Sequence, residues 1–230
     1  MQKSIKHEEN MNQLSTNDHK ERINRVLTYI QKHLDEHLDL DTLSKVACFS
    51  SFHFHRIFSA YMGESVSNYV RRIRLENAAG LLRYTDIPIG DIGFKAGYET
   101  HSAFSKAFKQ LFGTSPINFR KEKPHYHLQL DKPEPLTTQN GDIVMDYEIR
   151  ERDEKLAVYC RQLGKYQDAA TKAWKNVCDF AFPKQLVKNE TEFIGISYDN
   201  PDITAEEKLR YDACITVDKA VECSGDIGTI

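Results

Sequence analysis

The pattern that decides the fold of this chain is LSKVACF at residues 43–49, which returns as IGFKAGY at residues 92–98. The apolar positions, the small alanine and the final aromatic residue coincide at a spacing of 49 residues. A second pair follows, FHRIF at residues 54–58 and FSKAF at residues 104–108, at a spacing of 50. Because insertions collect in turns, the extra residue in the second copy predicts a turn between two helices. The chain therefore carries two copies of one structural unit.

Each copy is typical of two short helices joined by a tight turn, the helix-turn-helix arrangement. The first helix bears apolar residues at helical spacing, and Ser, Glu or Thr residues suited to begin the second helix follow it. Gly97 suits a left-handed helix end in copy two, and Gly63 and Gly113 are expected to end the second helices. We also expect a helix over residues 23–30 and a long helix over residues 69–82 that bridges the copies.

Composition narrows the class of protein. With 40% hydrophobic and 28% charged residues, the 230-residue chain is typical of globular proteins with one or two domains. No apolar stretch approaches the ~20 residues that cross a bilayer, and the start of the chain lacks the apolar core of a secretory signal. The five cysteines are widely spaced without a CxxC pair, so we expect no disulfide framework, no metal site and no cofactor. These features predict a cytoplasmic protein without a membrane partner.

The net charge of −3 hides a difference between the two halves. Residues 20–125 hold 16 Lys and Arg against 11 Asp and Glu, whereas residues 126–230 hold 13 against 20. A basic half beside an acidic half indicates that one half meets a polyanion. Two unrelated solvated surfaces would give a similar difference, so the charges alone leave both interpretations open.

Residues 20–123 resemble the DNA-binding domain of the AraC/XylS family of bacterial regulators. The two repeated motifs carry the resemblance, together with the segments around Gly63, Tyr69 and Arg74-Leu75 and the run GTSP at residues 113–116. The resemblance covers about a hundred residues with the correct internal spacing. It implies a sequence-specific transcription regulator, expected to be an activator, that contacts double-stranded promoter DNA and RNA polymerase.

The second helix of each copy is expected to lie in the major groove with its outward face toward the bases. The outward residues of the two helices are Ser51, Phe52, His55, Arg56, His101, Ser102, Ser105 and Lys106. The resemblance puts base readout on Phe52, His55 and Arg56, and Arg56 suits a bidentate contact to guanine worth ~1–3 kcal/mol. Lys106 stands where the family often has arginine, which favours a phosphate contact there. A core position for Phe52 is the alternative.

Two further groups of residues allow more than one interpretation. Arg71, Arg72, Arg74 and Arg120 suit phosphate contacts or salt bridges within the domain equally well. Cys48 lies inside the first helix-turn-helix, where we expect it to be buried and structural. Some DNA-repair regulators share this DNA-binding domain and use reactive cysteines, but no cysteine cluster precedes residue 20.

The second half of the chain follows a linker at residues 124–141, rich in proline and charge. Alternation of apolar and polar residues predicts strands at 143–149, 156–161, 193–198 and 211–217, and a helix at 167–182. The whole chain is thus expected to be multidomain, with an all-α N-terminal domain of two helix-turn-helix units joined by a long helix, followed by an α+β domain with an antiparallel sheet. Residues 1–19 are expected to be disordered.

Residues 142–230 resemble the GyrI-like small-molecule-binding domain through GKY at 164–166, YDNP at 198–201 and RYDAC at 210–214. The resemblance implies an amphipathic, cationic effector bound near Tyr166, Trp174 and Tyr198, although core packing suits Trp174 better. Only about half of such a domain follows the linker. We favour a truncated domain; a half supplied by another subunit and a loss of ligand binding are the alternatives.

No acid–base pair or nucleophile stands out, so we expect no enzyme activity. The competing hypothesis is a ligand-sequestering or hydrolytic GyrI-like protein with a vestigial DNA-binding half.

Overall fold

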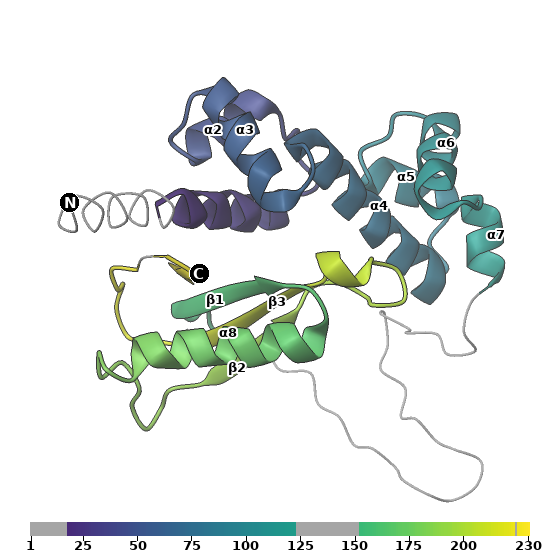
Figure 1. Cartoon of the computed structure of the whole chain (residues 1–230). Coiled ribbons are helices and arrows are strands. Elements are labelled where there is room, and N and C mark those ends of the chain that lie inside the picture. Colours follow the sequence, from purple (N-terminus) through teal and green to yellow (C-terminus); the bar gives the residue numbers. More distant parts are fainter. Residues whose placement is uncertain (1–17, 123–151, 224) are drawn as a thin grey trace, which may run out of the picture. The chain divides into compact units, whose positions relative to one another are not determined.

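The computed structural model describes residues 18–122, 152–223 and 225–230 (Figure 1). They belong to two compact units, one made of Met1–Glu76 with Lys155–Ile230 and the other of Asn77–Glu154. Copy one of the repeat thus shares its unit with the C-terminal sheet, whereas copy two forms a unit with the end of the long helix. The predicted linker at 124–141 and the predicted strand at 143–149 lie outside the described residues, and the domain boundaries there remain predictions.

Copy one forms α2 (Leu40–Val46) and α3 (Ser51–Met62). The carboxylate of Asp39 accepts a hydrogen bond from Thr42 N, and the hydroxyl of Ser50 accepts one from His53 N. These side chains satisfy backbone donors that a helix start leaves unpaired. Gly63, at φ +67°, ends α3 in the left-handed conformation. The predictions that a serine begins the second helix of copy one and that Gly63 ends it are confirmed.

The residues ahead of copy one are helical over 18–32. The expectation of disorder is therefore wrong for residues 18 and 19. Asp18 Oδ2 lies 2.9 Å from Arg22 Nε, one helical turn away. The ring of His19 packs edge-on against Phe49 and His53. These contacts to the turn of copy one and to α3 hold the start of this helix in place.

Copy two forms α5 (Ile89–Lys95) and α6 (His101–Phe112), followed by α7 (Pro116–Lys121). Four residues, 47–50, separate the two helices of copy one, and five, 96–100, separate those of copy two. The extra residue of the second copy therefore lies in the turn, as the spacing predicts. Thr100 caps α6 by accepting from Ala103 N, and Gly113 ends it at φ +75°.

A single helix, α4 (Val66–Tyr84), runs from copy one toward copy two. Its Tyr69, Val70 and Ile73 belong to the buried cluster of copy one, with Phe54 and Phe58. The predicted bridging helix is confirmed. The Phe58 and Tyr69 rings pack edge-to-face with centroids 5.5 Å apart, so α4 and α3 share an aromatic core.

The two turns reach the same backbone conformation with different residues. Gly97 has φ +81°, and its counterpart Cys48 has φ +54°. A non-glycine residue in this region is uncommon because its Cβ crowds the following carbonyl. Cys48 is exposed, so the expectation of a buried structural cysteine is wrong. The reason is its place at the left-handed helix end, where the side chain points away from the core.

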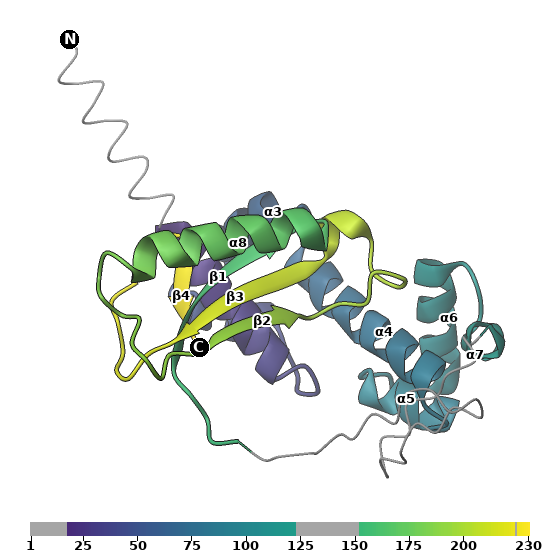
Figure 2. The same ribbon diagram turned by 90° about the horizontal axis from the view of Figure 1, so that it is seen from below.

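The C-terminal part folds as β1 (Ala157–Leu163), α8 (Tyr166–Ala181), β2 (Phe193–Ser197), β3 (Arg210–Thr216) and β4 (Ile227–Thr229). The strands form one antiparallel sheet in the order β2-β3-β1-β4, and Figure 2 shows α8 lying along it. Val158, Cys160, Ala213 and Ile215 pack against α8. The opposite face carries Tyr159 and Cys214 and meets the helix at 18–32. The predicted α+β fold with an antiparallel sheet is confirmed.

The close approach of α5 and α6 gives a test of this packing. A Cβ built on Gly93 would lie 3.1–3.3 Å from Phe104 side-chain atoms, whereas one on Gly90 of the same helix meets nothing within 4 Å. We expect Gly93→Val to lower the free energy of unfolding by roughly 1–3 kcal/mol because Phe104 must shift in a packed core. Gly90→Val is the matched control. Equal melting temperatures for the two variants in thermal denaturation would contradict this packing.

Candidate nucleic-acid interface

The outward face of α3 presents three of the residues predicted to read DNA. Phe52 is 80% exposed, and His55 and Arg56 are also exposed. Phe54 and Phe58 are fully buried on the opposite side. The alternative that Phe52 belongs to the core is therefore wrong. An aromatic ring, an imidazole and a guanidinium share one solvent-facing surface of the helix.

Ser51, the fourth predicted residue of α3, lies at its start and is already engaged within the domain. Its hydroxyl donates to Asp41 Oδ1 at 2.7 Å and lies 3.2 Å from Ser44 Oγ. These bonds tie the start of α3 to α2. Ser51 therefore positions the recognition helix in this structure, and a contact of its hydroxyl with DNA would require exchange of these partners.

The equivalent face of α6 carries serines and a lysine where that of α3 carries a phenyl ring and an arginine. His101, Ser102 and Lys106 are exposed, while Ser105 is half-buried with its Oγ 3.5 Å from His101 Nδ1. Phe104, Ala107 and Phe108 are buried beneath them. The structure thus places the predicted residues of each copy on one helix face, with the guanidinium on α3 and the ammonium on α6.

The arginines outside the recognition helices have partners inside the protein. Arg72 is 8% exposed and pairs with Glu64 at 2.7 Å and Glu76 at 3.0 Å. Arg74 donates to the carbonyl oxygens of Leu34 and Glu36. Arg120 donates to the carbonyl oxygen of Ile87. For these three arginines the structure favours contacts within the domain over a contact with phosphate. The fourth, Arg71, is exposed on α4.

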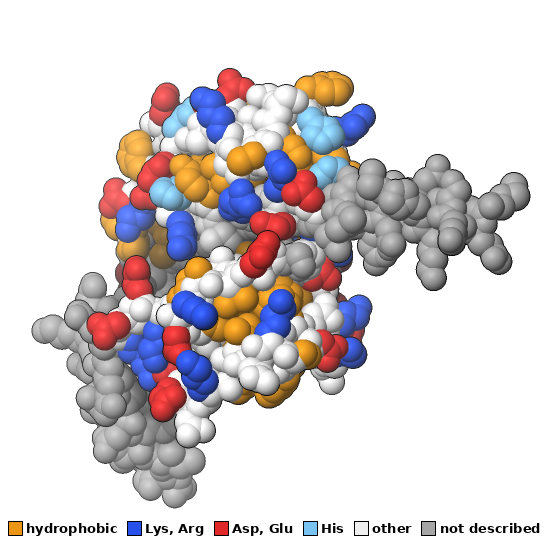
Figure 3. All heavy atoms as spheres, turned by 90° about the vertical axis from the view of Figure 1, so that its left-hand side faces the viewer, with side chains coloured by type: hydrophobic (Ala, Val, Ile, Leu, Met, Phe, Trp, Pro, Cys, Tyr) orange, Lys and Arg blue, Asp and Glu red, His pale blue; other side chains and the backbone are white. Residues whose placement is uncertain are grey.

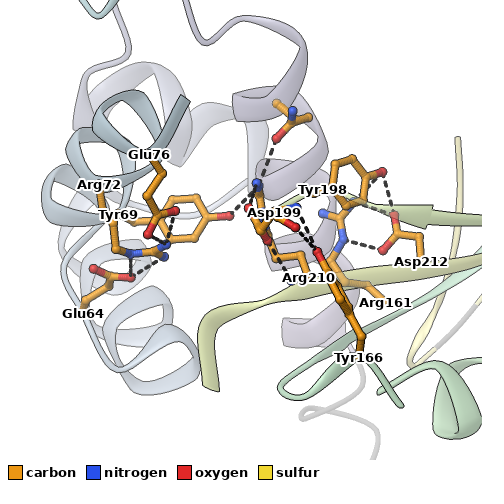
Figure 4. Close-up of polar contacts among 11 residues, drawn as sticks. Glu64, Tyr69, Arg72, Glu76, Arg161, Tyr166, Tyr198, Asp199, Arg210 and Asp212 are labelled. Atoms are coloured by element: carbon orange, nitrogen blue, oxygen red, sulfur yellow. Dashed lines mark hydrogen bonds and ion pairs between the residues drawn. The ribbon is translucent and has the colours of Figure 1, made fainter. Parts of the chain in front are cut away.

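A buried arginine of β3 joins the sheet to the helix at 18–32 and to α4 (Figure 4). Arg210 lies 2.6 Å from Asp199 through Nη2, and both side chains are less than 5% exposed. Its Nη1 donates to Gln31 Oε1 at 2.9 Å and to the Tyr69 hydroxyl at 3.3 Å. Nearby, Lys208 Nζ lies 3.3 Å from Glu64, the partner of Arg72. Sequence reasoning missed this network because its partners come from distant segments.

The residues predicted to bind a ligand do not converge on one site. Tyr198 lies with Arg161 and Asp212, and its hydroxyl donates to Asp212 Oδ2 at 2.9 Å. The Tyr166 hydroxyl bonds the backbone of Asp199, accepting from its N at 2.9 Å.

Trp174 belongs to α8 and packs on the face of the sheet that this helix covers. Its Nε1 donates to the Tyr211 hydroxyl at 3.0 Å, and its ring packs near Phe193, with centroids 6.1 Å apart. The ring of Tyr166 lies 6.2 Å from that of Tyr211. Tyr211 therefore connects Tyr166 with Trp174, whereas Tyr198 joins the charged residues of the other face.

The charges on the surface do not mark out a further binding area on the side drawn in Figure 3. On the side drawn in Figure 3, basic, acidic and hydrophobic side chains are interspersed, and no charge sign forms one continuous area. Within the described residues, no group of three or more His, Cys, Asp or Glu could hold a metal ion. None of the described helices is long and apolar enough to cross a membrane.

Comparisons with known proteins agree with the helix-turn-helix geometry. A family model described as a helix-turn-helix domain matches residues 43–122. The regulatory protein SoxS of Escherichia coli (strain K12) is 31% identical over 102 residues, which make up 44% of this chain and 95% of SoxS. The chain belongs to the AraC/XylS family of regulators. A model described as a GyrI-like small molecule binding domain matches residues 145–230, so this family member carries such a domain after its DNA-binding part.

Other relatives share the first part of this family member. The uncharacterized HTH-type transcriptional regulator YbfP of Bacillus subtilis (strain 168) is 39% identical over 98 residues, 43% of this chain and 33% of YbfP. The chain spans about a third of the length of the first curated relatives that it matches. The C-terminal domain of AraT, a response regulator from Geobacillus stearothermophilus, matches with a TM-score of 0.42 at 33% identity, over 46% of this chain and 93% of that chain.

The cysteines give a test of the burial described for both parts. Cys48 is exposed, while Cys160 and Cys214 are buried in the sheet. Burial raises the pKa of Cys214 to about 12 and also raises that of Cys160. Since the thiolate is the reactive form, we expect iodoacetamide at pH 8 to label Cys48 first and these two last. Peptide mass spectrometry after timed labelling checks the order, with unfolded protein as the control; fast labelling of Cys214 would contradict it.

Proposed function

We propose that this protein is a sequence-specific DNA-binding transcription regulator that reads promoter DNA through α3 and α6. The observation that carries the proposal is the shared outward face of Phe52, His55 and Arg56 above a buried phenylalanine core. Family membership supports the same conclusion, because SoxS is named as a regulatory protein. A helix whose apolar side is anchored in a domain core can present its polar side to the major groove.

The two recognition helices are expected to contribute unequally. A guanidinium matches the O6 and N7 acceptors of guanine in bidentate geometry, and an exposed aromatic ring suits a thymine methyl group. Arg56 and Phe52 of α3 offer both chemistries. Lys106 of α6 offers one compact charge, which suits a phosphate better. Most base discrimination is therefore expected under α3, on an asymmetric DNA site.

We further propose that the regulator recruits RNA polymerase and that a small amphipathic molecule on the C-terminal domain tunes its activity. The match to a GyrI-like small molecule binding domain supports the effector. The acidic half of the chain suits a cationic effector. Tyr166 and Trp174, which flank Tyr211, are candidate contacts on one face of the sheet, and Tyr198 is a candidate contact on the opposite face. We propose no catalytic role and no cofactor for either part.

Substitution of the two basic residues tests the proposed readout. On duplexes selected from a random pool, we expect Arg56→Ala to weaken binding roughly tenfold or more and to relax the preference at one base pair. Lys106→Ala is expected to weaken binding evenly across sequences. Lys172→Ala, which removes an exposed lysine of α8, is the charge-matched control. Unchanged affinity and preference in both variants would refute the proposed groove contacts.

The salt dependence of binding separates the two kinds of contact. Each neutralised phosphate adds about −0.9 to the slope of log affinity against log salt concentration. We therefore expect Lys106→Ala to make the slope shallower by about one, while Arg56→Ala leaves it nearly unchanged. Titrations between about 50 and 200 mM salt measure both slopes. The reverse result would exchange the roles assigned to these residues.

A further inference from the structure

The outer side of β2 (Phe193–Ser197) pairs with no strand that the structure describes. In the sheet order β2-β3-β1-β4, β2 stands at one end with β3 beside it (Figure 2). The other end is β4, which has three residues. An unpaired edge strand offers backbone N–H and C=O groups to a further strand, and a very short one offers few. We call the outer side of β2 the open edge of the sheet.

The backbone hydrogen bonds show which groups the open edge presents. At its two ends the strand is bonded to β3 through Glu192 O and Tyr198 N. In an antiparallel pair, residues whose backbone groups face the partner alternate with residues whose groups face away. The regular register between β2 and β3 therefore turns the N–H and C=O groups of Phe193, Gly195 and Ser197 outward.

Local bonds limit the open edge on both sides. Asp199 N, which follows the strand, donates to the Tyr166 hydroxyl at 2.9 Å. Thr191 N, which precedes it, donates to Lys188 O at 3.3 Å. The outward groups that remain are those of β2 itself. They form a stretch that is symmetrical about Gly195.

The open edge lacks the features by which proteins protect such strands. Lysine, proline and bulges are typical of protected edges. The sequence FIGIS at 193–197 contains no charged residue and no proline, and its pairing with β3 is regular. Phe193 is 48% exposed and Ile194 is 36% exposed. Apolar side chains beside outward backbone groups indicate that a further strand covers this edge.

The strand is complementary to itself. In an antiparallel pair of two copies with Gly195 opposite Gly195, Phe193 lies opposite Ser197 of the second copy, and the outward groups of both strands are paired. The same register sets Ile194 opposite Ile196 of the second copy, so the isoleucines of both copies meet around the twofold axis. Because FIGIS carries no charge, like charges do not oppose each other in this pairing.

We propose that β2 pairs with β2 of a second copy of this chain and joins the two sheets into one antiparallel sheet. The pairing uses the open edge of both copies and leaves the short β4 at each end, so association stops at a dimer. One strand buries little area beside the ~1,600 Å² of a standard interface, so we expect a weak and reversible dimer. The dimer goes beyond the proposed function, since its formation requires no DNA.

Amide hydrogen exchange of the full chain without DNA identifies what covers the open edge. Between about 1 μM and about 1 mM, where weak association falls, we expect exchange at Phe193, Gly195 and Ser197 to slow roughly tenfold or more. Slow exchange at every concentration would assign the edge to another segment of the same chain, such as the predicted strand at 143–149. Fast exchange at every concentration would leave the edge uncovered. Either result overturns the dimer.

A pair of lysine variants tests the register. Residues 194 of the two copies are diagonal neighbours in the proposed pairing, so Ile194→Lys brings two like charges together. Leu156→Lys is the matched control, because Leu156 is 37% exposed and precedes β1, outside the open edge. Far-UV circular dichroism checks that both variants are folded.

Sedimentation equilibrium of the same proteins measures the association. We expect the wild type and Leu156→Lys to approach twice the 26.6 kDa mass of one chain as concentration rises. Ile194→Lys is expected to dimerise about tenfold or more weakly. Equal association of the two variants, a wild type that keeps the mass of one chain at about 1 mM, or growth beyond two chains would each overturn the proposed pairing.

Discussion

The buried guanidinium of Arg210 is the interaction on which the unit of copy one and the sheet depends. A guanidinium stays protonated at every pH that a protein survives, so its burial demands partners on all sides. Burial by itself lowers the pKa of Arg210, but Tyr69 and Asp199 raise it above the ordinary value. Removal of one partner from such a pair typically costs about 3–5 kcal/mol, because the remaining charge is left buried. The sheet, the helix at 18–32 and α4 therefore hold one another in a defined arrangement.

Through Arg210 the C-terminal sheet is connected to α3 by a chain of side-chain contacts. The guanidinium donates to Tyr69, and the ring of Tyr69 packs against Phe58 of α3. Lys208 reaches Glu64, which follows the end of α3 and binds Arg72 of α4. A change in the sheet at β3 can therefore alter the support of α3 without any contact to its outward face. This gives the proposed effector control a physical basis in packing and ion pairs.

The repeat could be predicted from the sequence because its signals are local. Serine and threonine caps, glycine at helix ends and phenylalanine at helical spacing act within a few residues, so the turns of both copies and the exposed Phe52 and Arg56 follow from pattern. The partners of Arg210 could not be predicted in the same way, whereas Glu76, one partner of Arg72, lies one helical turn away on α4. A carboxylate that pairs with a residue far away in the sequence leaves no periodic pattern. For the same reason, the hydrogen bond from the Ser51 hydroxyl to Asp41 could not be predicted.

The division into compact units was also beyond sequence reasoning. Order along the chain suggests that the two copies belong together and that the sheet stands apart, yet copy one shares its unit with the sheet. The cause is side-chain chemistry at long range, such as Thr28 Oγ1 lying 3.2 Å from the Tyr159 hydroxyl. The exposure of Cys48 has a local cause, because its backbone takes the left-handed conformation that Gly97 takes in copy two.

The hydrogen bond between Gln31 and Arg210 joins residues 179 positions apart. Closing so long a loop costs conformational entropy before any contact across it is gained, and contacts of high sequence separation slow folding. The unit that holds copy two, in contrast, is one continuous segment, Asn77–Glu154. During synthesis from the N-terminus, the helices of both copies emerge before β3, and the unit that copy one shares with the sheet is completed only when β3 follows. The unit that contains α3 is thus the later of the two to be completed.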